Sequence, residues 1–362
     1  MMKERQSNIE LLRIVAIIGV IVLHYNNPSI GGGIAYAQEG SINYYILYFL
    51  ESLFACGVDL FIIISGYFMC TSYKKNMWRL VELIVQVIIF REALYLVRVA
   101  FKSELFSIRG IVSAFIPANY FVILYGVVFI LSPYINFLLN RLSEKCFHTL
   151  MIVSICLFSV YPTLIDILGE IRGEPFRGLS SIGMYGSQWG YSAINFLLMY
   201  LVGAYLRKEC SRIHNAKEWQ LLIGLVISII ITVFWARIND IVGFFTERSA
   251  WEYCNPLIIL IAVFLFELFS RINLGSKKII NTLAEGVFTV FLLHSVFIPY
   301  LQIEKFVNEN PVVMILHIIM CVSLIYLVCW CVHKAYHLIT DPIFKVLSKK
   351  YKNFCIEVET QE

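Results

Sequence analysis

The chain has 362 residues, of which 59% are hydrophobic and 15% are charged, and it carries a net charge of +4. Soluble proteins average about 25% charged residues, so this composition excludes water as the main solvent of the protein surface. No long basic segment is available to bind nucleic acid, and the ten cysteines form no pair of CxxC motifs that would hold zinc. We therefore expect neither a nucleic-acid partner nor a bound metal.

Apolar runs of membrane-spanning length recur along the whole chain. An α-helix needs about 20 apolar residues to cross the hydrocarbon core of a bilayer. The first run follows two basic residues, as in a signal peptide, but no small-residue cleavage site ends it, so we expect it to be a permanent span. We predict an all-α, polytopic integral membrane protein of about ten transmembrane helices. They lie near residues 9–26, 43–70, 80–101, 118–139, 149–168, 191–206, 219–238, 255–270, 280–300 and 313–338.

The distribution of Lys and Arg predicts the orientation of these spans. An even number of spans puts both termini on one side of the membrane. With the N-terminus inside, nineteen Lys and Arg residues fall in inner segments and seven in outer segments. The positive-inside rule then places both termini in the cytoplasm, and we expect a multi-pass protein of the plasma membrane. Because no linker divides the chain, we expect one domain over residues 1–362, with a core of about 5–340 and a cytoplasmic tail of 341–362.

The first span contains three ionisable residues, Glu10, Arg13 and His24. Such residues are costly inside a membrane and usually mark function. The eleven-residue spacing of Arg13 and His24 brings both to nearly one helix face, about 16 Å apart along the axis. Arg13 is charged at any working pH and could hold an anionic group, while His24 could take a proton from a hydroxyl. The alternative is an interfacial i,i+3 pair of Glu10 with Arg13 and a His24 that snorkels to the interface.

The second span contains Asp59 among apolar residues and ends in Ser65 and Gly66. Glycine permits the close approach of a helix or a ligand, and serine can bond a backbone carbonyl or a ligand. Helix packing is the commoner explanation of such a pair. A basic cluster follows directly, which suits either the phosphates of a nucleotide-like donor or anionic lipid headgroups. Its members are Lys74, Lys75 and Arg79.

Two further spans contain ionisable residues. The third holds Arg91, Glu92 and Arg98, and the ninth holds His294 at a membrane depth similar to that of His24. Two histidines at one depth could flank an acceptor site, although a lone membrane histidine is as often a structural hydrogen-bond donor. The longest outer connection, about residues 169–190, is polar, Gly-rich and aromatic, which suits a lid or an acceptor-binding loop. The sequence contains no P-loop, HExxH, GxSxG or Rossmann motif.

Several segments together resemble the acyltransferase 3 family of membrane proteins, which includes O-acetyltransferases of bacterial surface polysaccharides. They are Ile9-Glu10-Leu11-Leu12 with Arg13-x10-His24, Gly57-Val58-Asp59-Leu60-Phe61 leading to Ser65-Gly66-Tyr67, YFVILYGVVFILSPYIN at 120–136 and FLLHSVFI at 291–298. Their order and spacing cover nearly the whole chain, from residue 5 to about 340. Two departures are Glu10, where many members have Asp, and Tyr120-Phe121-Val122, where Trp-Phe-Leu is common.

The resemblance implies transfer of an acyl group, usually acetyl from acetyl-CoA or another acyl-CoA, to a sugar hydroxyl. The family's signature residues map onto Arg13 and onto His24 as the catalytic base. Its serine-glycine motif maps onto Ser65 and Gly66 and its basic residues, approximately, onto 74–79, as binding residues for the donor. Glu10, Asp59, Arg91 and His294 are expected to support the site. The expected partners are the lipid bilayer and a glycan or glycolipid acceptor of the cell envelope or of an exported polymer.

Two other functional classes fit the sequence. One is a transporter or exporter of a polysaccharide or lipid-linked glycan, in which the intramembrane charges line a path. Repeat symmetry or helices broken at mid-membrane would favour it, and neither is evident in the sequence. The other is a structural subunit of a polysaccharide-synthesis complex that lacks turnover. Stabilisation by acetyl-CoA would favour the enzyme, because a ligand stabilises the folded state that binds it.

Overall fold

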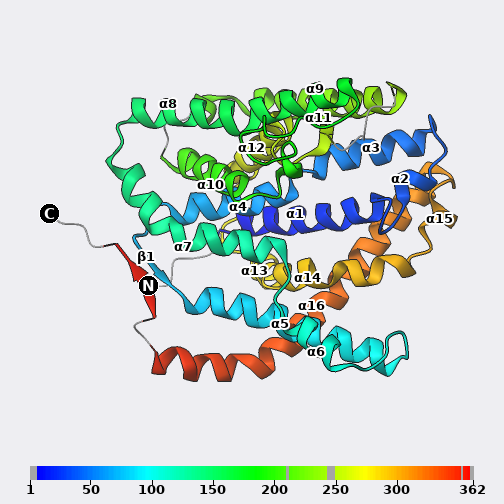
Figure 1. The fold of residues 1–362 in the computed structure, drawn as a ribbon, viewed down its shortest axis with the longest axis vertical. Helices are drawn as coiled ribbons and strands as arrows, with labels where there is room; N and C mark the ends of the chain where they lie inside the picture. The colour runs from blue at the N-terminus through cyan, green and yellow to red at the C-terminus, as the bar shows by residue number, and fades with distance from the viewer. Residues whose placement is uncertain (1–5, 209–211, 243–248, 352–353, 359–362) are drawn as a thin grey trace. The chain divides into compact units, whose positions relative to one another are not determined.

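The computed structural model describes residues 6–208, 212–242, 249–351 and 354–358. Over these ranges the chain is almost entirely helical, with one two-stranded antiparallel sheet (Figure 1). The predicted all-α fold class is therefore confirmed. The chain divides into two compact units, residues 1–69 with 142–333, and residues 70–141 with 334–362. We call them unit 1 and unit 2 and describe each by itself. The expectation of a single domain stays a prediction.

All ten predicted spans coincide with helices. Seven helical stretches in the described ranges are long and apolar enough to cross a membrane, and a bent pair over residues 278–300 would make an eighth. The predicted span near 191–206 is a shorter apolar helix, and that near 80–101 contains several charged residues. The protein is thus a multi-pass membrane protein. The count of ten stays a prediction.

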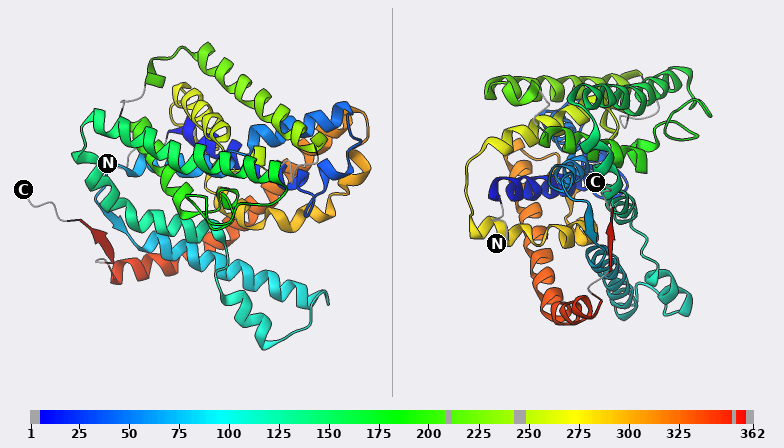
Figure 2. Two further views of the ribbon diagram at one scale, coloured as in Figure 1. Left: turned by 45° about the horizontal axis from the view of Figure 1, so that its top comes forward. Right: turned by 90° about the vertical axis from the view of Figure 1, so that its left-hand side faces the viewer.

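Unit 1 contains most of the helices. In the described part of unit 1, α8 and α9 are joined by a π-helical turn, Cys156–Val160, and together form one continuous rod (Figure 2). By contrast, α13 and α14 meet at a bend of 57°. Its α-helices are α1 (Ser7–Asn26), α2 (Gly33–Tyr36), α3 (Ile42–Phe54), α4 (Gly57–Met69), α8 (Glu144–Ile155), α9 (Tyr161–Arg172), α10 (Ala193–Arg207), α11 (Glu218–Val242), α12 (Pro256–Arg271), α13 (Lys278–Ala284), α14 (Val287–Phe297), α15 (Ile303–Phe306) and the larger part of α16 (Pro311–Lys350). Short 3-10 turns lie at Gln188–Gly190, Arg212–Asn215, Ser249–Trp251 and Ile298–Tyr300.

The core of unit 1 forms where α1, α4, α10 and α12 pack together. Gly66 in α4 and Gly203 in α10 allow the two helices to touch, because a Cβ atom on Gly66 would lie 2.2 Å from the Tyr200 carbonyl oxygen. A Cβ atom on Gly203 would likewise lie 2.1 Å from the Ile63 oxygen. Small residues permit such contacts between membrane helices. Gly66 of the predicted Ser-Gly motif therefore has a packing role.

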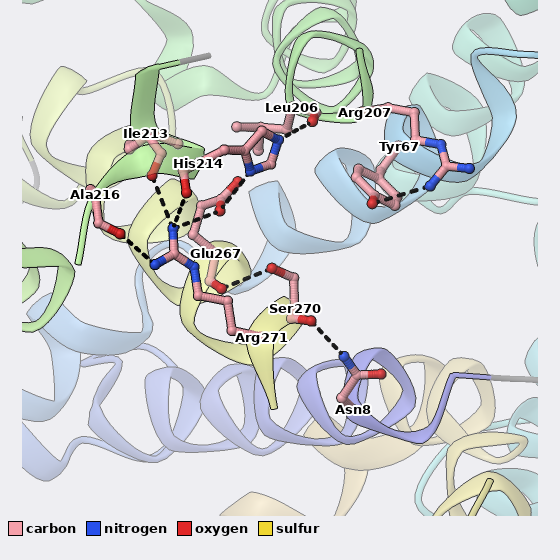
Figure 3. A network of polar contacts seen from close by, with 10 residues as sticks. All are labelled: Asn8, Tyr67, Leu206, Arg207, Ile213, His214, Ala216, Glu267, Ser270 and Arg271. Atoms are coloured by element: carbon pink, nitrogen blue, oxygen red, sulfur yellow. Dashed lines mark hydrogen bonds and ion pairs between the residues drawn. The ribbon is translucent and has the colours of Figure 1, made fainter. Parts of the chain in front are cut away.

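A polar network closes one end of unit 1 (Figure 3). Glu267 near the end of α12 is fully buried, and its Oε2 atom lies 3.1 Å from His214 Nδ1 and 3.5 Å from Arg271 Nη2. Asn8 of α1 donates to the backbone oxygens of Phe269 and Ser270. The first residues of α1 therefore lie beside the last residues of α12. We call this the Glu267 end of unit 1, and the opposite end of α1 the His24 end.

Unit 2 is smaller and contains the basic cluster. In it α5 packs against α6 and α7, and β1 pairs with β2 so that Lys75 lies opposite Ile356. The C-terminal residues, predicted as a tail, thus extend α16 and then form a strand. The elements are β1 (Lys74–Asn76), α5 (Trp78–Ala100), α6 (Ile108–Phe115), α7 (Tyr120–Arg141), the last part of α16 and β2 (Cys355–Glu357).

Candidate active site

Two histidines from distant parts of the sequence meet at the His24 end of unit 1. His24 lies in the last turn of α1 and His294 in the last turn of α14, and these two helices pack together. His24 Nδ1 lies 3.2 Å from His294 Nε2, and the two rings meet edge to face with centroids 4.6 Å apart. His294 is buried, whereas His24 is half-buried. The structure thus joins two residues that the sequence placed only at a similar depth.

Hydrogen bonds to the backbone determine which ring nitrogens carry protons. His24 Nδ1 lies 2.8 Å from the Val20 oxygen and His294 Nδ1 lies 2.9 Å from the Val290 oxygen. A carbonyl oxygen only accepts, so both Nδ1 atoms are assigned a proton. In a neutral His294 the Nε2 atom is then an acceptor. The His24 Nδ1–H group is therefore shared between two acceptors, His294 Nε2 and the Val20 oxygen. This assignment leaves the lone pair of His24 on Nε2, the position required of a general base.

A cavity of about 400 Å³ opens at His24. Its wall includes Asn26, Glu51, Trp189, Trp251 and Glu252. Some of these groups are held by neighbours: Asn26 Nδ2 donates to Glu51 Oε2 at 2.9 Å, and Trp251 Nε1 donates to the Ser52 hydroxyl at 2.9 Å. The volume lies within the range of roughly 300–1,000 Å³ that is usual for small-molecule sites. A polar molecule in this cavity would have His24 in its wall.

A second cavity of about 530 Å³ shares part of this wall, namely Trp189, Tyr191 and Glu252. Asp166 and Glu170 of α9 also line it. Sequence reasoning predicted an acceptor-binding loop over 169–190, and residues of this loop do form cavity walls, but it did not identify Asp166 or Glu252. The available signal was an acidic residue at the border of an apolar span, as both of these are.

Arg13 lies toward the other end of α1 from His24. Its Nη1 atom is 2.7 Å from Glu10 Oε1, in an i,i+3 ion pair, and about a third of its side chain is exposed. The ion pair is the arrangement that the alternative interpretation of the sequence described. It leaves part of the guanidinium accessible, so a role of Arg13 toward a donor or acceptor stays a prediction.

The second predicted group lies in α4. Asp59 is buried, with 1% of its surface exposed, and accepts a hydrogen bond from Asn195 Nδ2 of α10 at 3.3 Å. Ser65 donates to the Phe61 oxygen within its own helix. Asp59 therefore links α4 to α10, as Gly66 does. The structure gives this group helix contacts, and its proposed donor contacts stay a prediction.

The basic cluster lies in unit 2 around β1. Lys74 and Arg79 are exposed, and Lys74 Nζ forms an ion pair with Glu357 of β2, which raises the pKa of that lysine. Lys75 is buried, and burial, together with the nearby charge of Arg79, lowers its pKa to about 8. Arg91 of α5 donates to the backbone oxygens of residues 113, 114 and 118, and thereby connects α5 with the segment around α6.

The fold and the histidine pair together define a multi-pass membrane protein with a cavity that has a histidine in its wall. The family model described as an acyltransferase domain matches residues 6–334, nearly the whole chain. The chain therefore belongs to this family, which the motifs of its first two spans resemble, and it is a membrane acyltransferase. Neither the curated proteins nor the solved structures contain a match to it.

Proposed function

We propose that the protein is an O-acyltransferase of the plasma membrane that moves an acetyl group from acetyl-CoA to a hydroxyl of a cell-envelope or exported glycan. The observation that supports it most is His24, which lies in the wall of a cavity and contacts His294 through its Nδ1 atom. Acyl transfer to a hydroxyl needs a base within reach of the acceptor, and a base held by a fixed partner is more effective than a mobile one.

In the proposed reaction, His24 Nε2 accepts the proton of the acceptor hydroxyl while the hydroxyl oxygen attacks the thioester carbonyl carbon. The C–O bond of the new ester forms and the C–S bond of the thioester breaks. The proton then passes from His24 to the sulfur of the departing CoA. His294 Nε2 keeps the hydrogen bond from His24 Nδ1 throughout and so stabilises the imidazolium that forms.

The donor is assigned to the predicted basic and small residues. CoA carries several phosphate charges, and the exposed side chains of Lys74 and Arg79 suit these anions. Arg13 is proposed to orient the donor or the acceptor, with Ser65 and Gly66 as further donor-binding residues. Both termini are proposed to be cytoplasmic, which puts the basic cluster on the side where acetyl-CoA is made available.

The test measures transfer of radiolabelled acetyl from acetyl-CoA to the de-O-acetylated glycan fraction of the producing cells, in membranes that contain the protein. We expect label in alkali-labile esters with the wild-type protein, and a loss of about 100-fold or more with His24→Ala. Thermal unfolding with and without acetyl-CoA shows whether the variant still folds and binds the donor. Transfer at the wild-type rate by a folded His24→Ala protein would remove His24 from the mechanism.

A further inference from the structure

The cavity beside the His24 cavity has a lining that suits a sugar. We propose that it binds an uncharged pyranose unit of the acceptor, adjacent in the glycan to the unit that is acylated at His24. This inference rests on the proposed function. The two cavities share Trp189, Tyr191 and Glu252 in their walls, so one oligosaccharide can extend from one into the other.

The backbone around Trp189 is held in an unusual conformation. Gln188 and Trp189 have φ values of 56° and 55°, in the left-handed region that non-glycine residues rarely adopt. Such residues carry backbone strain and cluster at functional sites. The Trp189 carbonyl oxygen accepts a hydrogen bond from the Tyr253 backbone, which helps to fix the turn. The strained turn thus presents a large aromatic ring at the junction of the two cavities.

Trp189 offers a face on which a pyranose can stack. About half of its surface is exposed, although tryptophan is among the side chains with the most apolar area to bury. A pyranose ring has one face made largely of C–H groups, which can pack on an aromatic ring, while its hydroxyls remain free at the edge. Tyr185 and Tyr191 line the same cavity and are also exposed. Aromatic rings and carboxyl groups therefore line the same space.

The carboxylates of this cavity suit hydroxyl donors. Asp166, Glu170 and Glu252 line it, and carboxyl oxygens accept hydrogen bonds, while a protonated carboxyl also donates one. Ser187 holds two of them in place: its hydroxyl donates to Glu252 at 2.6 Å and its backbone N–H to Asp166 at 3.2 Å. In the described part of the chain no group of three His, Cys, Asp or Glu side chains is placed to share a metal ion. Sugar hydroxyls are thus the partners that fit this arrangement.

The same carboxylates disfavour an acidic sugar. Among the residues that the structure describes, no Lys or Arg lines either cavity. Of the nearby cations in the loop, Arg172 is paired with Glu174 at 2.6 Å, and the Arg177 guanidinium lies 5.7 Å from the centre of the Tyr185 ring. A uronate or phosphate group would therefore meet acidic side chains with no cation among the described lining residues to compensate, which costs binding energy. The occupant is accordingly an uncharged pyranose.

The test compares Trp189→Ala with Trp189→Phe and with Trp219→Ala. Trp219 is another exposed tryptophan, at the start of α11, and serves as the matched control. The acceptor is the de-O-acetylated glycan fraction of the producing cells, separated by anion exchange into neutral and acidic pools, with labelled acetyl-CoA as donor. We expect Trp189→Ala to lower kcat/KM for the neutral pool about tenfold, with KM for acetyl-CoA and its thermal stabilisation unchanged. Trp189→Phe and Trp219→Ala should stay within about twofold of wild type.

A charge change provides the second arm. Glu170→Lys should increase the use of the acidic pool relative to the neutral pool, whereas Glu170→Gln should not. Label that enters mainly the acidic pool with the wild-type protein, or an unchanged kcat/KM in Trp189→Ala, would overturn the subsite while leaving the acyltransferase proposal intact. If the wild-type protein transfers no acetyl to either pool and is not stabilised by acetyl-CoA, the proposed function fails and the subsite fails with it.

Discussion

His294 matters through the hydrogen bond that it accepts from His24. The two rings are 270 positions apart in the sequence, and the bond between them is 3.2 Å long. Because His294 Nε2 faces His24 Nδ1, it would fix the orientation of His24 and, in the proposed reaction, stabilise its protonated form. We regard His294 as a positioning residue, since it acts through His24.

We predict that His294→Ala lowers kcat by about 10- to 100-fold, with KM for acetyl-CoA unchanged. His294→Gln, whose amide oxygen can accept the same hydrogen bond, should recover part of this loss. The measurement is steady-state acetyl transfer for both variants, with thermal unfolding as the control for folding. Equal loss in the two variants would indicate that His294 serves packing alone.

The pKa of Lys75 leads to a prediction about how the affinity for acetyl-CoA depends on pH. Burial and Arg79 lower its pKa to about 8, so its ammonium form is roughly 90% populated at pH 7 and 10% at pH 9. If Lys75 contributes charge to donor binding, the affinity for acetyl-CoA falls between pH 7 and 9 with a midpoint near 8. Lys75→Arg, which keeps its charge, should remove this dependence, and Arg79→Gln should move the midpoint to higher pH. The measurement is the Kd for acetyl-CoA as a function of pH.

The stability of the protein should change with pH in the opposite direction. The folded-state pKa of Lys75 lies below its unfolded value of about 10.4, so the unfolded chain binds more protons across this window. Lys75 therefore makes the free energy of unfolding rise with pH from about 8 to 10. A Kd that stays constant while the stability rises would restrict Lys75 to a structural role.

At the residue scale, the sequence reveals His24 more readily than its surroundings. An imidazole and a guanidinium eleven residues apart in one apolar helix are unusual enough to be noticed. The contact with His294, however, depends on how α1 and α14 pack, which no local pattern encodes. Trp189 and Glu252 escape notice for another reason, since aromatic and acidic residues are ordinary at the border of a membrane span.

At the element scale, the contact between α4 and α10 depends on two glycines. We predict that Gly66→Ala and Gly203→Ala each destabilise the protein by about 1–3 kcal/mol, because their Cβ atoms would overlap the backbone of the facing helix. Ser65→Ala is the control, since Ser65 bonds only within its own helix among the contacts seen here. Thermal unfolding in detergent measures the effect. A Gly66→Ala protein of wild-type stability that has lost acetyl-CoA binding would instead favour a direct donor contact.

The positions of the helices could be predicted because the length of an apolar run is enough to identify a transmembrane helix. Interruptions were harder: Gly286 lies at the bend between α13 and α14, and Pro162 follows the π-helical turn at 156–160, but neither residue alone specifies a bend or a π-helical turn. The sheet was missed for a similar reason. Each strand has three residues, Lys74–Asn76 and Cys355–Glu357, too few to show the alternation that marks a strand.

At the scale of the whole molecule, composition sufficed for the class of the protein, because membrane proteins differ from soluble ones in their total apolar content. The order of the spans and the motifs along them sufficed for the family. The cavities could not be predicted, since their walls come from α1, α3, α9, the 185–191 turn and residues 251–253, segments whose meeting depends on the tertiary fold.

The orientation of unit 1 in the membrane gives the last prediction. Asn8 donates a hydrogen bond to Ser270 at the end of α12. The loop that follows α12, with Lys277 and Lys278, therefore lies at the Glu267 end. At the other end, Tyr25 bonds His317, whose Nε2 atom faces the Leu301 oxygen, so the turn around Glu304 lies near His24. The excess of Lys and Arg at the Glu267 end predicts that it faces the cytoplasm.

Single cysteines at Ser276 and Glu304, both exposed, test this orientation in a variant whose native cysteines are replaced by serine. In intact cells a membrane-impermeant thiol reagent should label Glu304→Cys and leave Ser276→Cys unlabelled, and permeabilisation should make both reactive. Retained acetyl transfer by the cysteine-free protein is the control for folding. The reverse pattern would place His24 and both cavities on the cytoplasmic side, and the acceptor would then have to be acylated before export, as a cytoplasmic precursor.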